Sequence, residues 1–295
     1  MPDKLILQIP AKINLSLDIT GKRADGYHTL RSVFQAIGIY DTLTLTKADA
    51  DTPFSLTCTD PAVPCDARNL VWKAAAALLG DTPKGLTAHL EKHIPSQAGM
   101  GGGSADCAAA LLGIRQMLCP DVTDAELHAI AARLGADVAF FLCGGTALCA
   151  GIGDQLTPIS YPGGFPERYV VMAKGTEGVS TPAGYRALDA LPALPAPDTD
   201  AVLAHLADSD PMGLFSVCGN MFDAVTDLPE VQQIRKILRE NGARPVLSGS
   251  GAAVFGGCRD KAHAESCAAA IRAAGIPFAA VCQLLPGGIT VTAEG

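Results

Sequence analysis

Residues 94–114, IPSQAGMGGGSADCAAALLGI, have the composition that most directly suggests chemistry. Four of the five residues 99–103 are glycine, and an alanine-rich segment follows at once. We expect that segment to be a helix with Ser104 as its N-cap. Bare backbone in front of a helix exposes N–H groups, and the helix dipole adds about half a positive charge there. The stretch therefore predicts an anion site, with phosphate as the natural ligand.

Familiar phosphate-binding patterns are absent from this stretch. A P-loop needs Gly-Lys followed by Ser or Thr, which occurs nowhere in the sequence. The Gly-x-Gly-x-x-Gly spacing fails because Ser104 stands where the third glycine would be. The protein-kinase motifs His-Arg-Asp and Asp-Phe-Gly are also missing. An alternative stays open, in which the glycines only allow a sharp turn and close helix packing.

The elements expected around the loop are mostly strands. Over residues 13–19 apolar side chains alternate with polar ones, and Lys12 shares the polar face of this expected strand. The other elements expected before residue 160 are a turn at 25–26, strands at 32–40, 41–47 and 85–94, a helix at 69–79, a helix with a capping box from 123 to 135, and two strands around 144–154.

The second half of the sequence has a different pattern of expected helices and strands. Residues 159–169 are rich in Pro and Gly between two apolar runs, so we expect the chain to cross between two domains there. The elements expected beyond it are a strand at 169–173, a Pro-rich loop at 192–197, helices at 200–207 and 229–240, a strand–turn–strand unit over 244–257, a helix at 260–274 and a strand at 277–283. The order αββαβ indicates a small α+β sandwich of the split βαβ kind.

Composition and charge exclude several classes of protein. With 22 Lys and Arg against 30 Asp and Glu, the chain lacks the basic footprint that nucleic-acid binding requires. Residues 273–293 carry no charge, but Gly and Pro interrupt them, so we expect two short strands and no membrane span. The first residues alternate apolar and polar types, which does not indicate export.

Cysteine and histidine spacing does not indicate a metal site. The ten cysteines are scattered without a Cys-x-x-Cys pair, as is typical of reduced thiols in a cytoplasmic protein. His89 and His93 fall on an expected strand, where four residues span roughly 13 Å at about 3.3 Å each. They are too far apart to share one ion.

Four segments, in this order and spacing, resemble the GHMP family of small-molecule kinases, which includes galactokinase, homoserine kinase, mevalonate kinase and phosphomevalonate kinase. The segments are residues 10–35, 95–112, 134–154 and 247–257. Lys-x-Asn followed by Asp-Gly-Tyr-His is similar to one member, whose alcohol substrate carries a cytidine diphosphate group. The likeness covers most of residues 5–160 and the segment 179–185, but little between 187 and 240.

The resemblance implies an α+β fold with two domains. Residues 1–160 would form an N-terminal domain of ribosomal-protein-S5 type that binds ATP and carries catalysis. Residues 161–295 would form a ferredoxin-like α/β sandwich that closes on the substrate. ATP and a small-molecule substrate would meet in the cleft between them, and we expect a monomer or a weak dimer.

Phosphoryl transfer to an alcohol needs a phosphate cradle, a positive charge and a group that takes the proton of the hydroxyl. The resemblance makes Asp137 the catalytic base, with apolar neighbours that desolvate its carboxylate. It pairs Lys12 with Asp137. The ATP phosphates would lie on the glycine loop, residues 95–105, which are Pro95, Ser96, Gln97, Ala98, Gly99, Met100, Gly101, Gly102, Gly103, Ser104 and Ala105.

The resemblance also implies a set of substrate contacts. Tyr27 and Tyr185 would stack on the cytosine, and His28 would read the edge of the base. Asn14 and Thr181 would contact the sugar-alcohol or phosphate portion. The serine–glycine turn, residues 248–251, would close on the substrate from the second domain with Ser248, Gly249, Ser250 and Gly251.

The glycine loop departs from the usual family pattern at Gln97, Ala98, Met100 and Ala105. Ala105 removes a hydroxyl that a relative could offer to Mg²⁺, so we expect the ATP phosphates to carry most of the Mg²⁺ coordination. Two alternatives stay open. One is a sibling kinase for another small alcohol, such as homoserine or mevalonate. The other is a nucleotide-binding regulator without turnover, which would have no need of both Lys12 and Asp137.

Overall fold

Two sheets, the first mixed and the second antiparallel, organise the protein, whose computed structural model describes residues 2–191, 196–208 and 210–294. The Pro-rich loop expected at 192–197 therefore lies mostly outside the described residues. The first sheet has the order β12-β1-β2-β4-β3, with β5, β6 and β8 attached beside this path. The second sheet has the order β11-β7-β10-β9. The fold is α+β, as the sequence predicts.

A long hairpin forms the backbone of the first sheet. Its strands are β1 (Lys4–Lys22) and β2 (His28–Lys47), joined by the expected turn at residues 25–26. We expected two strands, at 32–40 and 41–47, where the structure has one. The register shifts between Pro10 and Ala11 of β1, because β2 carries extra residues opposite them. Such a bulge bends a strand without ending it.

The remaining strands of this sheet are short. They are β3 (Ser55–Cys58), β4 (Leu86–Glu91), β5 (Thr146–Ala150), β6 (Gln155–Pro158), β8 (Gly219–Asn220) and β12 (Thr290–Glu294). The strand expected at 85–94 is thus confirmed as β4, and the two strands expected around 144–154 are β5 and β6, of which β6 begins just after residue 154. Both β8 and β12 pair with β1, so the second half of the chain returns twice to the first sheet.

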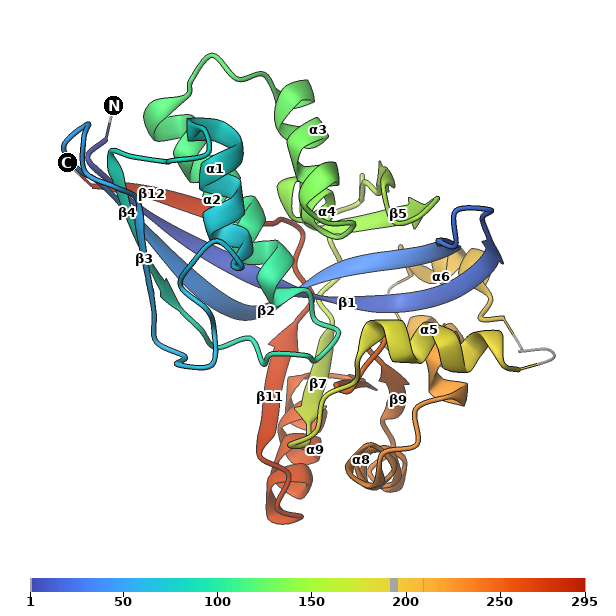
Figure 1. Cartoon of the computed structure of the whole chain (residues 1–295). Coiled ribbons are helices and arrows are strands. Elements are labelled where there is room, and N and C mark those ends of the chain that lie inside the picture. The colour runs from blue at the N-terminus through green and yellow to red at the C-terminus, as the bar shows by residue number, and fades with distance from the viewer. Residues whose placement is uncertain (1, 192–195, 209, 295) are drawn as a thin grey trace.

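Four helices cover one face of the first sheet, while the second sheet lies on the other side of the hairpin (Figure 1). They are α1 (Leu70–Leu79), α2 (Gly102–Leu118), α3 (Asp124–Leu134) and α4 (Val138–Cys143). The capping box of Thr123 and Glu126 is confirmed at the start of α3. Small residues, namely four alanines, Gly113 and Cys107, make up much of the buried side of α2 and let the helix lie close to the sheet.

The expected N-cap of α2 is wrong. Gly101, not Ser104, occupies the N-cap position, with a φ of 74° and no side-chain hydrogen bond to the helix. A glycine adopts this left-handed conformation without steric cost, so the helix begins earlier than a hydroxyl-based rule predicts. Its first N–H groups are left without a side-chain cap, which suits an anion site.

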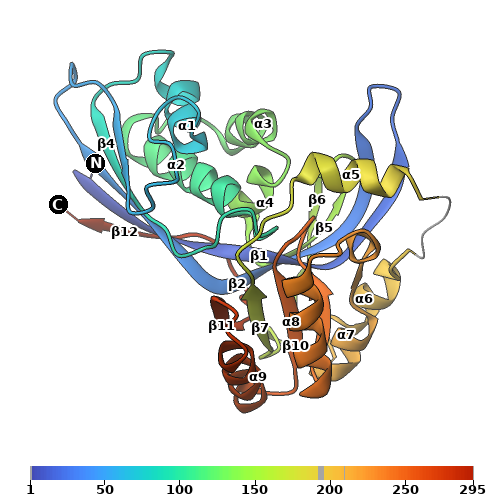
Figure 2. The same cartoon turned by 60° about the horizontal axis from the view of Figure 1, so that its bottom comes forward.

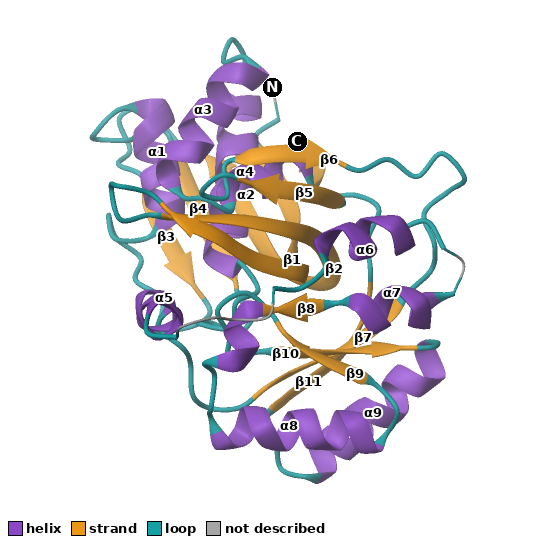
Figure 3. Ribbon diagram, turned by 90° about the vertical axis from the view of Figure 1, so that its right-hand side faces the viewer, coloured by secondary structure: helices purple, strands orange, loops and turns teal. Residues whose placement is uncertain are grey.

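The second sheet contains β7 (Tyr169–Lys174), β9 (Arg244–Leu247), β10 (Val254–Cys258) and β11 (Phe278–Gln283). Helices α8 (Pro229–Glu240) and α9 (Lys261–Ala273) cover its outer face (Figure 3). This arrangement confirms the split βαβ sandwich. Apolar residues of both sheets, among them Ile13, Ile37 and Phe255, meet in a shared buried cluster.

Smaller elements connect the two sheets. They are α5 (Thr181–Asp189), α6 (Thr199–His205), α7 (Pro211–Val217) and the 3-10 turn η1 (Met221–Ala224). Figure 2 shows α5 beside the far end of the β1–β2 hairpin. Among the described residues, no helix has both the length and the apolar character that crossing a membrane requires.

Candidate active site

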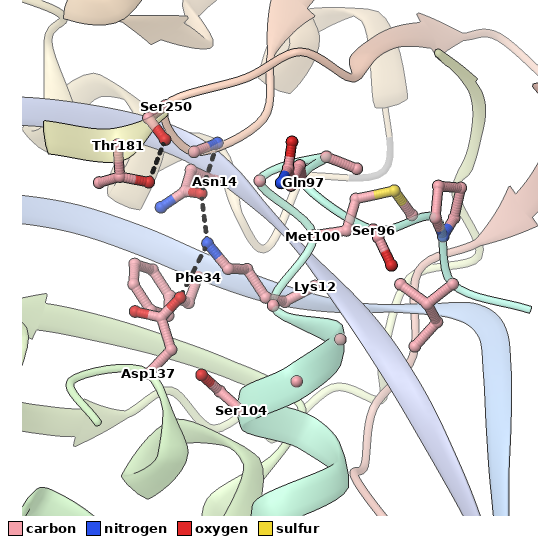
Figure 4. A pocket seen from close by; sticks show the side chains of 18 of the residues that line it. Lys12, Asn14, Phe34, Ser96, Gln97, Met100, Ser104, Asp137, Thr181 and Ser250 are labelled. Carbon is pink, nitrogen blue, oxygen red and sulfur yellow. Dashed lines mark hydrogen bonds and ion pairs between the residues drawn. The ribbon is translucent and has the colours of Figure 1, made fainter. Parts of the chain in front are cut away.

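A cavity of ≈ 400 Å³ opens where β1, the glycine loop, α5 and the serine–glycine turn come together (Figure 4). Most of the residues that the sequence singles out line it. These are Lys12, Asn14, Pro95, Ser96, Gln97, Ala98, Gly99, Met100, Gly101, Gly102, Gly103, Ser104, Asp137, Thr181, Tyr185, Gly249 and Ser250. The cavity walls do not include Tyr27, His28, Ala105, Ser248 or Gly251.

Lys12 and Asp137 form an ion pair in this cavity. The Lys12 Nζ lies 3.3 Å from the Asp137 Oδ2, and the two side chains are 4% and 30% exposed. Asp137 precedes α4 and makes no side-chain capping bond, so its carboxylate is not used to hold the helix. The Lys12 ammonium also lies 4.6 Å from the centre of the Phe34 ring, a cation–π contact. A buried lysine is thus paired with a partly exposed carboxylate.

Asn14 links this pair to the second half of the chain. Its Oδ1 accepts from the Lys12 Nζ at 2.8 Å and from the Gly249 N–H at 3.0 Å, while its Nδ2 donates to the Ser32 Oγ at 2.9 Å. Both polar atoms of the Asn14 amide thus have partners, and the residue is only 1% exposed. Its amide therefore positions the lysine and the serine–glycine turn together.

The glycine loop and the serine–glycine turn touch directly. The Ser248 Oγ donates to the Gly99 carbonyl at 3.0 Å, and the Ala253 N–H donates to the Ala98 carbonyl at 3.2 Å. A Cβ on Gly99 would lie 1.9 Å from the Ser248 carbonyl oxygen. Glycine is required at this position by the approach of the other backbone.

Glycine is also required at position 101, for a different reason. A Cβ there would lie 2.7 Å from the Phe141 ring, at a φ that disfavours side chains. Gln97 adopts a positive φ of 51° although it is not glycine, and it is the one such residue in the described chain. Although Gln97 differs from the usual family pattern, the backbone at this position is still left-handed.

Ala105 is fully buried inside α2 and faces the core. The structure therefore places it behind the loop, away from the cavity. Ser104, one residue earlier, does line the cavity, and its hydroxyl group faces the same space as the Asp137 carboxylate (Figure 4).

Near α5, the aromatic rings of three residues pack on one another. The His28 and Tyr185 rings stack with centroids 4.5 Å apart, and Tyr185 meets Phe222 edge to face at 5.1 Å. Burial, with a smaller effect from the charge of Asp137, raises the pKa of Tyr185 to about 12, so its phenol stays neutral. Tyr27 differs from them, because it is 63% exposed at the end of the hairpin.

Thr181 and Ser250 contact each other rather than standing apart. Their hydroxyl groups lie 2.8 Å from one another, between the start of α5 and the serine–glycine turn. Together with the Asn14 contact, this bond ties α5 and the turn to β1 around one opening (Figure 4).

Two groups of residues at the site were missed by the sequence analysis. Asp189 accepts from the His28 Nε2 at 2.7 Å and also pairs with Lys22. The hydrogen bond from Lys22, followed by that from His28, lowers the pKa of Asp189. Asp189 lies one helical turn beyond Tyr185, so helical spacing offered a signal for it.

The second missed group is a buried triad beneath the glycine loop. The Lys92 Nζ donates to Asp106 at 2.7 Å and also to Asp41, and all three side chains are at most 8% exposed. Burial, more than the charge of Asp41, raises the pKa of Asp106 to about 7. The Asp106 Oδ1 has no hydrogen-bond partner among the described residues.

The chain is similar to known proteins over both of its halves. Models of the GHMP kinases N terminal domain and of the GHMP kinases C terminal match residues 69–145 and 192–277. The chain is 40% identical over 259 residues to the 4-diphosphocytidyl-2-C-methyl-D-erythritol kinase of Geobacillus thermodenitrificans (strain NG80-2), covering 86% of this chain and 88% of the relative. The chain belongs to the GHMP kinase family.

Further relatives agree with this assignment. The equally named kinase of Clostridium novyi (strain NT) is 37% identical over 264 residues, which are 87% of this chain and 92% of the relative. A crystal structure of 4-(cytidine 5'-diphospho)-2C-methyl-D-erythritol kinase matches with a TM-score of 0.75 at 34% identity, covering 96% of this chain and 99% of that one. A homoserine kinase from Cytophaga hutchinsonii, at 20% identity, has a TM-score of 0.71 and covers 99% of this chain and 98% of that one. This last likeness concerns the GHMP fold alone.

Proposed function

We propose that this GHMP kinase transfers the γ-phosphoryl group of ATP to the 2-hydroxyl of 4-diphosphocytidyl-2-C-methyl-D-erythritol. The products are the 2-phosphate and ADP, and the reaction belongs to the non-mevalonate (methylerythritol phosphate) route to isoprenoid precursors. The observation that carries the proposal is the Lys12–Asp137 pair, held at 3.3 Å in one cavity with the glycine loop. The choice of acceptor is supported by the names of relatives that are 37–40% identical to this chain.

In the proposed reaction, Asp137 accepts the proton of the 2-hydroxyl as the oxygen attacks the γ-phosphorus. The bond between the γ-phosphorus and the β,γ-bridging oxygen breaks, and ADP leaves with its electron pair. Lys12 neutralises the charge of Asp137 in the resting site and lies beside the oxygen on which charge changes. Asn14 holds the ammonium in that place.

The phosphates of ATP are proposed to lie on the glycine loop. The first N–H groups of α2 have no side-chain cap, and they point out of the helix where a triphosphate can accept from them. The close contact of Gly99 with Ser248 gives this loop a fixed shape before ATP arrives.

The acceptor is proposed to enter between α5 and the end of the hairpin. Tyr185, with His28 stacked on it, presents an aromatic surface of the kind on which a nucleobase stacks. Tyr27 would contact the base from the outside. Asn14 and Thr181 would bind the sugar-alcohol or phosphate portion, and residues 248–251 would close the cavity.

Mg²⁺ is proposed to be held mainly by the phosphates of ATP. Asp137 is the one carboxylate among the described residues that line the cavity, and it is already paired with Lys12. The Ser104 hydroxyl remains as an oxygen that could complete the coordination. The ion would offset the negative charge of the phosphates during transfer.

We further propose a cytoplasmic enzyme that acts on a small molecule, without a nucleic-acid or membrane partner, as a monomer or weak dimer. The net charge of −8 disfavours a polyanionic partner. All ten cysteines are free thiols, as is usual in a reducing compartment.

The test is ADP release by the purified protein with ATP and Mg²⁺. The acceptors are 4-diphosphocytidyl-2-C-methyl-D-erythritol, homoserine, mevalonate and none. We expect release only with the cytidyl acceptor. Release with another alcohol would assign the chain to a sibling kinase, and no release with any acceptor would leave a nucleotide-binding protein.

A further inference from the structure

A second cavity, of ≈ 610 Å³, lies outside the active site among α7, η1, α8 and β9. Helix α8 and strand β9 belong to the half of the molecule built around the second sheet, and α7 lies beside that sheet (Figure 3). Three of the side chains that line it are guanidinium groups, and one is a carboxylate. They are Arg235, Arg239, Arg244 and Asp223.

The positive charge of this cavity is only partly compensated. Arg235 is buried and forms an ion pair with Asp223. Arg239 and Arg244 are exposed, and neither guanidinium group makes a hydrogen bond or ion pair with any described residue. The neighbouring Lys236 pairs with Glu240 and does not line the cavity. Two guanidinium groups thus stand unpaired in a protein whose net charge is −8.

Such a site matches the chemistry of phosphate. The planar guanidinium group binds phosphate oxygens through two parallel N–H donors, and two of them can hold a diphosphate. The Ser216 hydroxyl group donates to the Gly213 carbonyl at 2.7 Å, so the arginines are left as the donors for an anion. Met212 and Pro245 add apolar side chains to the lining. A cavity of this size falls within the range that small ligands occupy, about 300–1,000 Å³.

We propose that this second cavity binds a small organic phosphate or diphosphate, with Arg239 and Arg244 as its main ligands. The proposal goes beyond the kinase activity, because none of these arginines lines the active site.

The second cavity lies directly behind the turn that closes the active site. Asp223 accepts from the Leu247 N–H at 3.3 Å, and Leu247 is followed at once by the serine–glycine turn. Phe222, the residue just before Asp223, lines the active-site cavity. The Asn220 amide group donates to the carbonyl groups of Leu247 and Gly249, each at 2.8 Å. An anion that draws Arg235 away from Asp223 therefore acts on the segment that holds this turn.

Binding is tested by calorimetry with pyrophosphate as the probe. The protein is first saturated with ADP, so that the glycine loop is occupied. We expect one binding event that weakens with added salt. In the double variant R239Q/R244Q the Kd should rise about tenfold or more, because two charge-assisted contacts are lost. The control variant K236Q removes one charge from the same helix outside the cavity and should leave the Kd unchanged.

No binding, or binding that is equal in R239Q/R244Q and the unaltered protein, would overturn the proposal. Because the measurement needs no turnover, it can fail while the proposed kinase activity stands, and the reverse also holds. Both arginines are exposed, so a thermal melt is expected to show that the double variant folds normally.

The link to the active site has a separate readout. With free Mg²⁺ and ionic strength held constant, pyrophosphate should change the KM of the acceptor at least twofold in the unaltered protein. The same addition should leave the KM of R239Q/R244Q unchanged. An equal change in both proteins would place the effect at the glycine loop and contradict the link.

Discussion

The proposed active site has two ends that are built in different ways. The phosphoryl-transfer end lines the cavity, whereas at the acceptor end Tyr185 lines it and His28 and Tyr27 lie outside its walls. At the phosphoryl-transfer end, the Lys12 ammonium contacts Asn14 at 2.8 Å and Asp137 at 3.3 Å, and the glycine loop rests against the serine–glycine turn. At the acceptor end, His28 and Tyr185 stack on each other 4.5 Å apart, while Tyr27 is exposed.

We propose that this difference separates the residues that carry the chemical step from those that recognise the acceptor. The transfer end is assembled before any substrate binds, so its residues should govern kcat. The rings of the acceptor end are satisfied by one another, and a cytosine would add to an existing stack. Its residues should therefore govern the KM of the acceptor and leave the chemical step nearly unaffected.

The largest effect is expected from D137N at the transfer end. The amide cannot accept the proton of the hydroxyl, so kcat should fall about 10²-fold or more. Affinity for ATP should stay within a few-fold, because the glycine loop is untouched. Steady-state kinetics and nucleotide titration measure both, with D121N, an exposed aspartate elsewhere, as the control. Unchanged turnover would remove Asp137 from the mechanism.

At the acceptor end, H28A should raise the KM of the cytidyl acceptor about tenfold and leave kcat within a few-fold. Stacking on a base contributes about 1–3 kcal/mol, and Tyr185 loses the ring that supports it. Kinetics with the exposed H89A as control measure the effect. A fall in kcat as large as that of D137N would erase the division between the two ends.

The exposed Tyr27 sharpens the same comparison. Y27A should raise the KM of the acceptor by less than H28A does, because Tyr27 makes no ring contact with the stack among the described residues. The two variants are compared in one assay. An effect of Y27A larger than that of H28A would show that the base binds outside the His28–Tyr185 stack.

A smaller effect, on stability, is expected where the two halves meet. G99A places a Cβ against the Ser248 carbonyl at a positive φ, so it should lower the free energy of unfolding by about 1–2 kcal/mol. The matched control is G103A, whose Cβ would meet its nearest atom at 3.9 Å. Denaturant unfolding compares the two. Equal stability of both variants would mean that the loop does not depend on the turn.

The smallest effect concerns the triad beneath the loop. The pKa of Asp106 is raised to about 7 from the ordinary 3.8, so between about pH 4 and pH 7 the folded state binds more protons than the unfolded state. The charge on Asp106 then reduces stability progressively as the pH rises through this window. D106N removes that loss and should be more stable at pH 8 by about 1 kcal/mol.

Unfolding of D106N and of the unaltered protein at pH 5 and pH 8 checks this prediction. The variant should show the smaller difference between the two pH values. A variant that is less stable at pH 8 would mean that the Lys92–Asp106 ion pair outweighs the cost of burying the charge.

The sequence predicts the transfer end better than the acceptor end for a physical reason. The glycine loop and the strand of Lys12 are continuous motifs, and their local patterns indicate the right elements. The His28–Asp189 contact joins residues 161 positions apart, and the Lys92–Asp41 contact joins residues 51 positions apart. Only the folded chain brings such pairs together.

Local rules also failed where backbone geometry decided. The preference for a hydroxyl group at a helix start favoured Ser104, but Gly101 turns the chain before it. The bulge opposite Pro10 and Ala11 kept β2 continuous where the pattern indicated two strands. In both cases the competing feature was a property of the backbone that side-chain periodicity does not record.

The most direct test of the account is a crystal structure with a non-hydrolysable ATP analogue and 4-diphosphocytidyl-2-C-methyl-D-erythritol bound together. We predict the 2-hydroxyl oxygen within about 2.6–3.2 Å of the Asp137 carboxylate, the triphosphate on the glycine loop and the cytosine against the His28–Tyr185 stack. A 2-hydroxyl far from Asp137, with the phosphates in place on the loop, would contradict the proposed arrangement.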